Sequence, residues 1–261
     1  MYNEVIERFI AAQKAARAAY LSVAAFEREA LGDVPEHYRT VELRTEYKTR
    51  EELRKMCRTL AGNVVNRARR DFAPCGSRLD IKDQDEHEIA GLDIEDALNK
   101  GRVPDIDRLW TSLQARYQGD GGREMAYRQA AGRIVRTFGL NRKSEVKRTA
   151  SAVILRKTVY SEQVYRSSSR KVGYHSTQYT ADCLSGLATF AAKAGYTQMQ
   201  ANLSKVNLYD LTYDYREKWS MPGLDLVFFK DAWEFKFSHE VGNELMLFVG
   251  EYGQEALSER D

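Results

Sequence analysis

The sequence predicts a mostly helical α+β fold with a small C-terminal antiparallel sheet of three strands, packed on the first and last helices. Two observations support this fold class. Over long stretches apolar residues recur at intervals of three and four, as they do along one face of a helix. Near the C-terminus apolar and polar residues alternate strictly, which is the period of a half-buried strand. Only four prolines interrupt the 261 residues, so the pattern leaves room for long helices.

Residues 3–31 are predicted to form one long helix that ends at Gly32, Asp33 and Pro35. Its apolar residues follow spacings of four and three through nearly four heptads, which is typical of a helix that packs along another helix. We call these residues the seam: Val5, Phe9, Ala12, Ala16, Ala19, Val23, Phe26 and Ala30. The seam can be covered inside the monomer or by a second copy, so a homodimer through this helix is one expected partner.

Between residues 40 and 138 the sequence predicts one short strand followed by helices. The strand is expected at 40–48, where apolar and charged residues alternate. Thr49 and Glu52 form a capping-box pattern that starts a helix over 50–72. Further helices are expected at 93–100, 106–117 and 124–138, with a flexible glycine-rich joint at 119–122.

The C-terminal part contains the predicted sheet. Residues 146–159 fit either a helix or a strand, and residues 180–194 fit a helix. Strands are expected at 209–215, 224–229 and 233–237, of which the second is central because it is apolar on both faces. Ser238 is the expected N-cap of the last helix.

Charge is distributed in blocks although the formal net charge is only +2. Residues 39–78 and 123–171 are basic, whereas residues 79–107 and 205–261 are acidic. These blocks either neutralise each other inside the fold or leave a basic surface for phosphate. We expect two parts in the chain: 1–78, a long helix with a basic helical segment, and 79–261, an α+β domain packed as one unit with the first helix.

Bulk properties also restrict the location and the chemistry. Three scattered cysteines argue against a disulfide framework and for a cytoplasmic protein. No apolar run approaches the roughly 18 residues that a membrane span needs. The P-loop, the serine-hydrolase turn and a glycine-rich loop after a strand are all missing, and the four histidines are far apart. The acidic run from Asp80 to Glu88 lacks the spacing that wraps a calcium ion, so we expect a solvated loop. We expect no cofactor and no bound metal, and we lean against an enzyme.

Three stretches resemble one known family. The first joins residues 99–104 (Asn-Lys-Gly-Arg-Val-Pro) to residues 133–136 (Arg-Ile-Val-Arg), and the second is a basic-then-aliphatic run over 147–158. The third runs through 228–237 to the helix end at 250–253 (Gly-Glu-Tyr-Gly). In this order they resemble the family filed as domain of unknown function 4942, found in bacteria, phages and mobile elements. The resemblance covers about the last two-thirds of the chain. It implies a phage or mobile-element protein and supplies no catalytic residues.

One arrangement is nuclease-like. Asp225, Glu234 and Lys236 follow the order Asp…Glu-x-Lys on adjoining predicted strands. Many restriction-type nucleases use two carboxylates and a lysine in this way to bind Mg²⁺ and activate water. The solvent face of any amphipathic strand shows the same pattern. A cryptic metal-dependent nuclease is therefore an alternative function.

Basic residues with interleaved tyrosines predict a nucleic-acid interface, because Arg and Lys neutralise phosphates and exposed Tyr stacks on unpaired bases. The candidate residues are Arg133, Arg136, Arg142, Lys143, Lys147, Arg148, Arg166, Arg170 and Lys171, with Tyr160, Tyr165 and Tyr174 between them. The leading hypothesis is a non-catalytic protein that binds nucleic acid or a nucleoprotein complex. The alternative is a protein-binding inhibitor of a host defence system, of the anti-restriction or anti-CRISPR type. The pattern does not distinguish DNA from RNA.

Overall fold

The computed structural model describes residues 1–33, 35–38, 40–142 and 146–259, and the chain divides into two compact units. Unit 1 contains Met1–Asp71 and Ile81–Arg116, and unit 2 contains Phe72–Asp80 and Tyr117–Asp261. The units differ from the segments 1–78 and 79–261 expected from the sequence, because the chain leaves unit 1 and returns to it. No helix in the described residues is long and apolar enough to cross a membrane.

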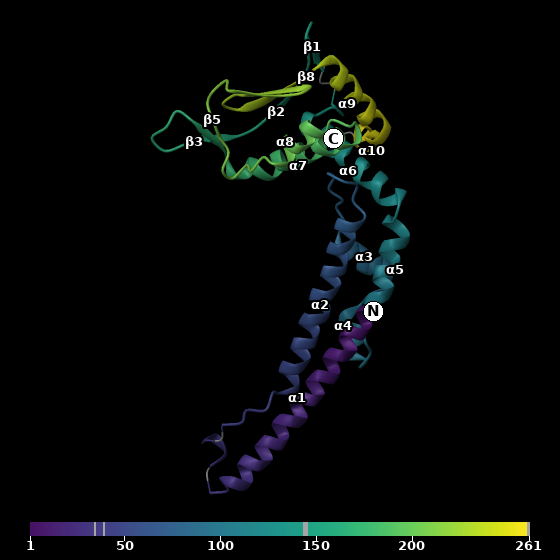
Figure 1. Cartoon of the computed structure of the whole chain (residues 1–261), viewed down its shortest axis with the longest axis vertical. Helices are drawn as coiled ribbons and strands as arrows, with labels where there is room; N and C mark the ends of the chain where they lie inside the picture. The colour runs from purple at the N-terminus through teal and green to yellow at the C-terminus, as the bar shows by residue number, and fades with distance from the viewer. Residues whose placement is uncertain (34, 39, 143–145, 260–261) are drawn as a thin grey trace. The chain divides into compact units, whose positions relative to one another are not determined.

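Unit 1 is helical (Figure 1). Its elements are α1 (Tyr2–Ala30), the 3-10 helix η1 (Glu36–Tyr38), α2 (Glu46–Asp71), α3 (Asp83–Ala90), α4 (Ile94–Asn99) and α5 (Ile106–Tyr117). α1 packs on α2. Asp107 at the start of α5 accepts hydrogen bonds from the amino group of Met1 (2.9 Å) and the amide of Tyr2 (2.7 Å), so α5 holds the first turn of α1. The first helix therefore packs on α2 within unit 1, whereas the sequence predicts that it packs with the sheet and the last helix.

The predicted strand at 40–48 is wrong. Residues 40–45 are irregular, and α2 begins at Glu46. The buried carboxylate of Glu27 accepts hydrogen bonds from the amides of Thr40 (2.7 Å) and Val41 (3.1 Å). These backbone donors are satisfied by a side chain and need no neighbouring strand. Thr45 Oγ1 accepts a hydrogen bond from the amide of Lys48 (3.2 Å) and so caps α2 earlier than the predicted capping box. The prediction of a solvated loop from Asp80 to Glu88 is also wrong, because α3 occupies most of these residues.

Unit 2 is built around a five-stranded antiparallel sheet in the order β1-β2-β8-β7-β6. The strands are β1 (Lys147–Arg148), β2 (Val153–Thr158), β6 (Lys218–Met221), β7 (Leu224–Phe228) and β8 (Ala232–Phe237). Leu155, Phe235 and Leu226 lie opposite one another across β2, β8 and β7, and all three are buried. One face of the sheet therefore belongs to the core, and the alternate residues form a polar face.

This sheet differs from the predicted one. Three strands were expected with 224–229 in the centre, but β8 is central because β2 pairs on its other side. The ambiguous residues 146–159 supply β1 and β2. The predicted strand at 209–215 is reduced to β5 (Thr212–Tyr213), which lies in a second sheet. That sheet, called sheet B here, also contains β3 (Ser161–Gln163) and β4 (Arg170–Val172), in the order β3-β4-β5.

Helices complete the core of unit 2. They are α6 (Asp120–Phe138), α7 (Tyr174–Lys193), α8 (Thr197–Ser204), α9 (His239–Tyr252) and α10 (Gln254–Ser258). Val135 of α6, Leu187 of α7 and Leu245 of α9 share one core with the apolar face of the five-stranded sheet. The expected joint at 119–122 is instead the first turn of α6, preceded by Gly119 at φ 70°. The predicted N-cap is confirmed, since Ser238 Oγ accepts a hydrogen bond from the Val241 amide (3.3 Å).

Candidate nucleic-acid interface

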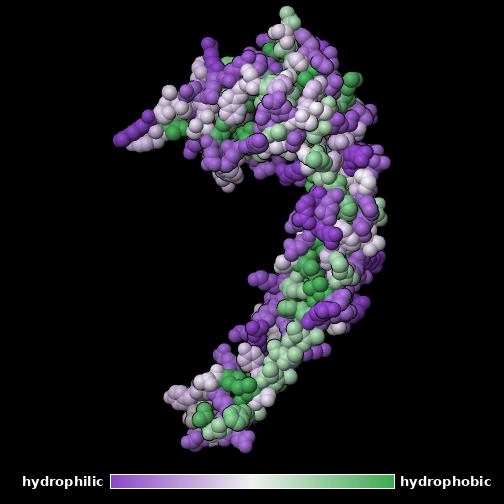
Figure 2. All heavy atoms as spheres, in the orientation of Figure 1, coloured by the Kyte–Doolittle hydropathy of each residue, from purple (hydrophilic) through white to green (hydrophobic). Residues whose placement is uncertain are grey.

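The hairpin that joins β3 to β4 projects from the rest of unit 2 (Figure 1) and ends in a tight turn. The amide of Ser167 donates to the carbonyl of Val164 at 3.1 Å, so Tyr165 and Arg166 occupy the tip. Arg166 has a φ of 56°, a left-handed conformation that costs a non-glycine residue about 1 kcal/mol. Its guanidinium lies 5.0 Å from the centre of the Tyr165 ring, and that ring is 82% exposed. Figure 2 shows mainly hydrophilic residues where this hairpin projects.

The turn after β5 repeats this arrangement. Arg216 has a φ of 66°, and its guanidinium lies 5.2 Å from the centre of the Tyr215 ring. The Tyr215 ring is held edge-on against Phe229, with the ring centres 6.0 Å apart. A second exposed tyrosine–arginine pair is therefore fixed in place by the fold.

Strand pairing brings the two turns to the same end of sheet B. β4 and β5 are antiparallel, with Arg170 opposite Tyr213, so the residues before β4 and those after β5 lie at one end. Ser169 Oγ donates to Asp214 Oδ1 at 2.9 Å and links the two segments directly. We call Tyr165, Arg166, Tyr215 and Arg216 the Tyr-Arg end of sheet B.

Charge at this end is available to a ligand. Within the described residues, neither Arg166 nor Arg216 has a carboxylate partner. Lys171 lies nearby on the exposed face of β4, 3.8 Å from the carboxylate of Glu162. Arg170 differs from these residues, because it donates to the hydroxyl and the carbonyl of Ser161 (2.7 Å each) and so stabilises the hairpin itself.

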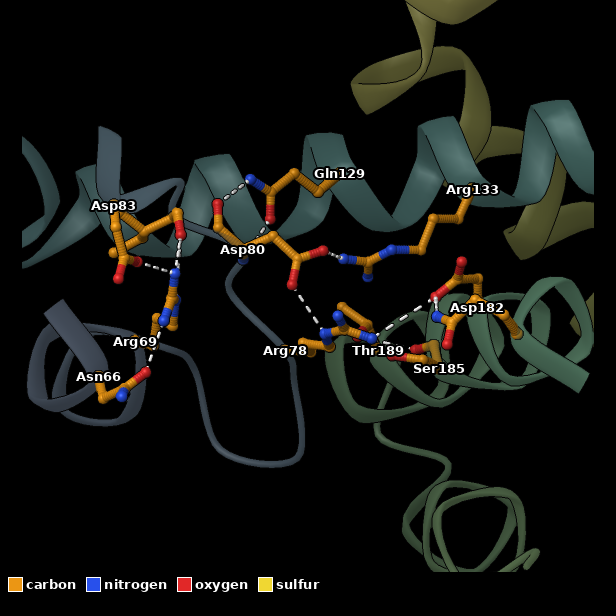
Figure 3. Close-up of polar contacts among 12 residues, drawn as sticks. Asn66, Arg69, Arg78, Asp80, Asp83, Gln129, Arg133, Asp182, Ser185 and Thr189 are labelled. Carbon is orange, nitrogen blue, oxygen red and sulfur yellow. Dashed lines mark hydrogen bonds and ion pairs between the residues drawn. The ribbon is translucent and has the colours of Figure 1, made fainter. Parts of the chain in front are cut away.

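Arg133 is committed to a polar network within unit 2 and is only 9% exposed (Figure 3). Its guanidinium donates to Asp80 Oδ2, and Arg78 donates to Asp80 Oδ1 at 2.7 Å. The side chain of Gln129 bonds to the amide and the carbonyl of Asp80, at 2.8 and 2.7 Å. The network fastens segment 72–80 to α6. Arg133 is therefore left out of the interface that we infer.

The remaining predicted basic residues do not join sheet B. Arg136 on α6 lies 3.5 Å from the carboxylate of Glu259. Others are exposed on β1 or in the turn after α6: Lys147, Arg148 and Arg142. Lys143 lies outside the described residues. Of the candidates that the structure describes, Arg166, Arg170 and Lys171 belong to sheet B and its hairpin, whereas the others lie on α6, on β1 or in the turn after α6.

The nuclease-like residues share the polar face of the five-stranded sheet. Asp225 lies opposite Lys236, and Glu234 lies 3.7 Å from the Lys236 ammonium. Lys218 pairs with Asp225 at 2.7 Å. Burial raises the pKa of Asp225, but hydrogen bonds from Lys218 and Ser220 outweigh it and hold the pKa below its usual value. The carboxylate is thus already neutralised by lysine. In the described part of the chain, no three His, Cys, Asp or Glu residues gather as metal ligands.

Sequence reasoning missed Tyr215 and Arg216, because they fell at the end of a predicted strand. The Tyr-Arg dipeptide occurs at 165–166 and 215–216, but it also occurs at 38–39 and 127–128, so the sequence alone does not single out these two turns. The pairing of β4 with β5 is what places the dipeptides at 165–166 and 215–216 at one end of sheet B.

No protein-family model matches the chain, and no curated protein or solved structure matches it either. The resemblance to the domain of unknown function 4942 stays a prediction. We therefore infer the function from the residues of this chain.

Proposed function

We propose that this protein binds single-stranded nucleic acid through the Tyr-Arg end of sheet B, without catalysing a reaction. The observation that carries this proposal is the pair of exposed tyrosine–arginine turns at one end of the sheet. A phage or mobile-element origin and a cytoplasmic location remain expectations from the sequence.

The chemistry of the two residue types fits this ligand. Exposed tyrosine rings offer faces on which unpaired bases stack, worth about 1–3 kcal/mol per base. A guanidinium that lies over a ring is held in position while its N–H groups stay free to donate to phosphate. Paired bases in a duplex do not present their faces to such rings, so we expect a preference for single strands.

The backbone supports a functional reading of both arginines. Glycine adopts positive φ without cost, whereas arginine pays about 1 kcal/mol at each turn. Arg166 and Arg216 occupy such positions, which glycine would adopt without that cost. Strained residues of this kind concentrate at binding sites, where the side chain offsets the cost.

The experiment is a binding titration of labelled single-stranded DNA, single-stranded RNA and duplex DNA by fluorescence anisotropy. We expect wild-type affinity to fall steeply as salt increases, because phosphate contacts release counterions. The double variant Arg166→Gly with Arg216→Gly is expected to bind at least about tenfold more weakly and with a shallower salt slope. The same variant is expected to unfold at a higher temperature, since glycine relieves the backbone strain.

A control removes one exposed charge elsewhere in unit 2, through Lys205→Gln, and should leave affinity unchanged. Unaltered binding by the double glycine variant contradicts the proposed interface. If no nucleic acid binds, the proposal fails and the protein-binding hypothesis gains support. Cleavage of the labelled strands after addition of Mg²⁺ or Mn²⁺, abolished by Glu234→Ala, would contradict a non-catalytic role.

A further inference from the structure

Most of the seam of α1 is open to solvent in unit 1. Val23 and Phe26 are 53% and 70% exposed, and no seam residue is buried. Apolar residues are visible along α1 in Figure 2. The residues that α1 does bury are Tyr2, Ile6 and Glu27, all outside the seam. A heptad stripe on one helix is a packing surface, and this one is left open to solvent.

The side of α1 that faces the rest of unit 1 buries Tyr2 and Ile6 and also makes polar contacts with α2. Gln13 donates to the carbonyl of Thr49 at 3.1 Å, and Arg17 lies 3.4 Å from the carboxylate of Glu46. A helix of a soluble protein normally turns its apolar stripe inward and its polar residues outward. Here Phe9, Ala12 and Ala16 of the seam line a hollow beside residues 43–52 of unit 1, whereas the later part of the seam, with Val23 and Phe26, is open to solvent. An exposed apolar stripe of this kind is the arrangement expected when a further helix covers it.

We propose that a second copy of this chain covers the seam, with the two α1 helices packed antiparallel. The heptad is self-complementary in this direction. Phe9 meets Phe26 of the second copy, Ala12 meets Val23, and Ala16 meets Ala19. The small residues at the centre let the two helix axes approach closely, while the large ones close both ends. The symmetry of the pair repeats every contact, so both copies are covered completely.

Charge selects the antiparallel direction. In the heptad that the seam defines, Arg8 and Glu29 occupy equivalent flanking positions at opposite ends of α1. Arg8 pairs with Glu4 of its own helix at 2.7 Å, and antiparallel pairing also places it beside Glu29 of the other copy. Parallel pairing places Arg8 beside the neutral Gln13 and leaves Glu29 without a basic neighbour on the facing helix. Oppositely charged flanks of this kind set the orientation of paired helices.

The oligomeric state of the full chain tests the proposal, measured by sedimentation over a hundredfold range of protein concentration. We expect a dimer whose dissociation constant rises by at least about 100-fold in Ala16→Glu with Ala19→Glu, because the carboxylates would be desolvated in the interface. The matched control, Ala11→Glu with Ala18→Glu, places the same charges on the opposite side of α1 and should leave the dimer intact. Circular dichroism checks that helix content is unchanged in both variants.

A wild-type monomer at every concentration overturns the proposal, and so does a dimer that the seam variant does not weaken. Cross-linking tests the direction in a Cys75→Ser background, because Cys57 and Cys183 are buried. Chains carrying Ala12→Cys are mixed with chains carrying Val23→Cys and oxidised. Antiparallel pairing predicts cross-links mainly between the two kinds of chain, whereas cross-links between two Ala12→Cys chains would overturn the antiparallel arrangement. Adding Glu29→Arg is expected to restore the affinity that Arg8→Glu removes.

Discussion

Lys157 shows how a single charge can sit in the core without a role in the inferred interface. It lies on β2 opposite Trp233 and faces the core with only 7% of its surface exposed. Burial lowers the pKa of its ammonium group, and the nearby Cys183 and Asp182 oppose that shift only in part. Among the described residues, no carboxylate forms an ion pair with it. The folded state therefore holds a charge that would be better solvated in the unfolded chain.

We expect Lys157→Met to raise the free energy of unfolding at neutral pH by about 1–3 kcal/mol, because it replaces a desolvated ammonium with an apolar chain of similar length. The advantage should shrink at alkaline pH. The pKa of Lys157 is lower in the folded state than in the unfolded state, where it is near 10.4. At pH values between these two pKa values the unfolded state binds more protons than the folded state. The free energy of unfolding of the wild type therefore rises with pH over this range.

Urea unfolding at several pH values measures both effects. Arg156→Gln is the control, since Arg156 is exposed on the polar face of the same strand and its replacement should change stability by less than about 0.5 kcal/mol. A Lys157→Met protein that is less stable than the control at neutral pH would contradict this account.

At the scale of elements, the contact between α9 and β2 depends on one glycine. A Cβ atom built at Gly242 would lie 2.7 Å from Cβ and Cγ2 of Val153. The backbone of α9 at Gly242 therefore packs directly on the side chain of Val153 in β2, and there is no room for a methyl group at this position. Gly250 in the same helix has no neighbouring atom within 4 Å of the corresponding position.

We expect Gly242→Ala to lower the free energy of unfolding by about 1–3 kcal/mol through overpacking. Gly250→Ala is the matched control and should raise it by up to about 1 kcal/mol, because alanine favours the helix and meets no obstacle. Chemical denaturation of the two variants measures both changes. Equal effects of the two substitutions would show that the contact with Val153 does not limit the packing.

Local signals predicted helices better than strands, for reasons that particular elements make clear. The predicted helix at 106–117 has the limits of α5, and Ser238 caps α9 as expected. The alternating tyrosines at 209–215 failed to predict a full strand, because Tyr209 and Tyr215 are exposed in irregular segments while only Tyr213 is buried. A tyrosine ring suits either environment, so its periodicity does not reveal which side is covered.

At the scale of the whole molecule, the two units have separate buried sets. The large core cluster contains residues of unit 2 alone, and the buried residues Ile6, Val65 and Leu109 of unit 1 do not belong to it. Chains with separate cores commonly unfold in more than one step.

We therefore expect calorimetry to resolve two unfolding transitions. Gly242→Ala should lower the midpoint of only one of them, since Gly242 lies in unit 2. A single transition with equal calorimetric and van't Hoff enthalpies, shifted as a whole by the substitution, would contradict separate unfolding.

The sequence by itself determined most of the helices, the capped start of the last helix, the apolar stripe of the first helix and the alternation of residues 233–237 in β8. These features depend on the spacing of residues along a few turns or strand positions, so they are present in the local pattern. Only the tertiary structure decided that β2 pairs with β8, that Arg133 is bonded to Asp80, and that the two Tyr-Arg turns meet at one end of sheet B. It also left the seam uncovered. Each of these outcomes joins residues far apart in the chain, and such pairings are selected by packing and hydrogen bonding of the whole fold.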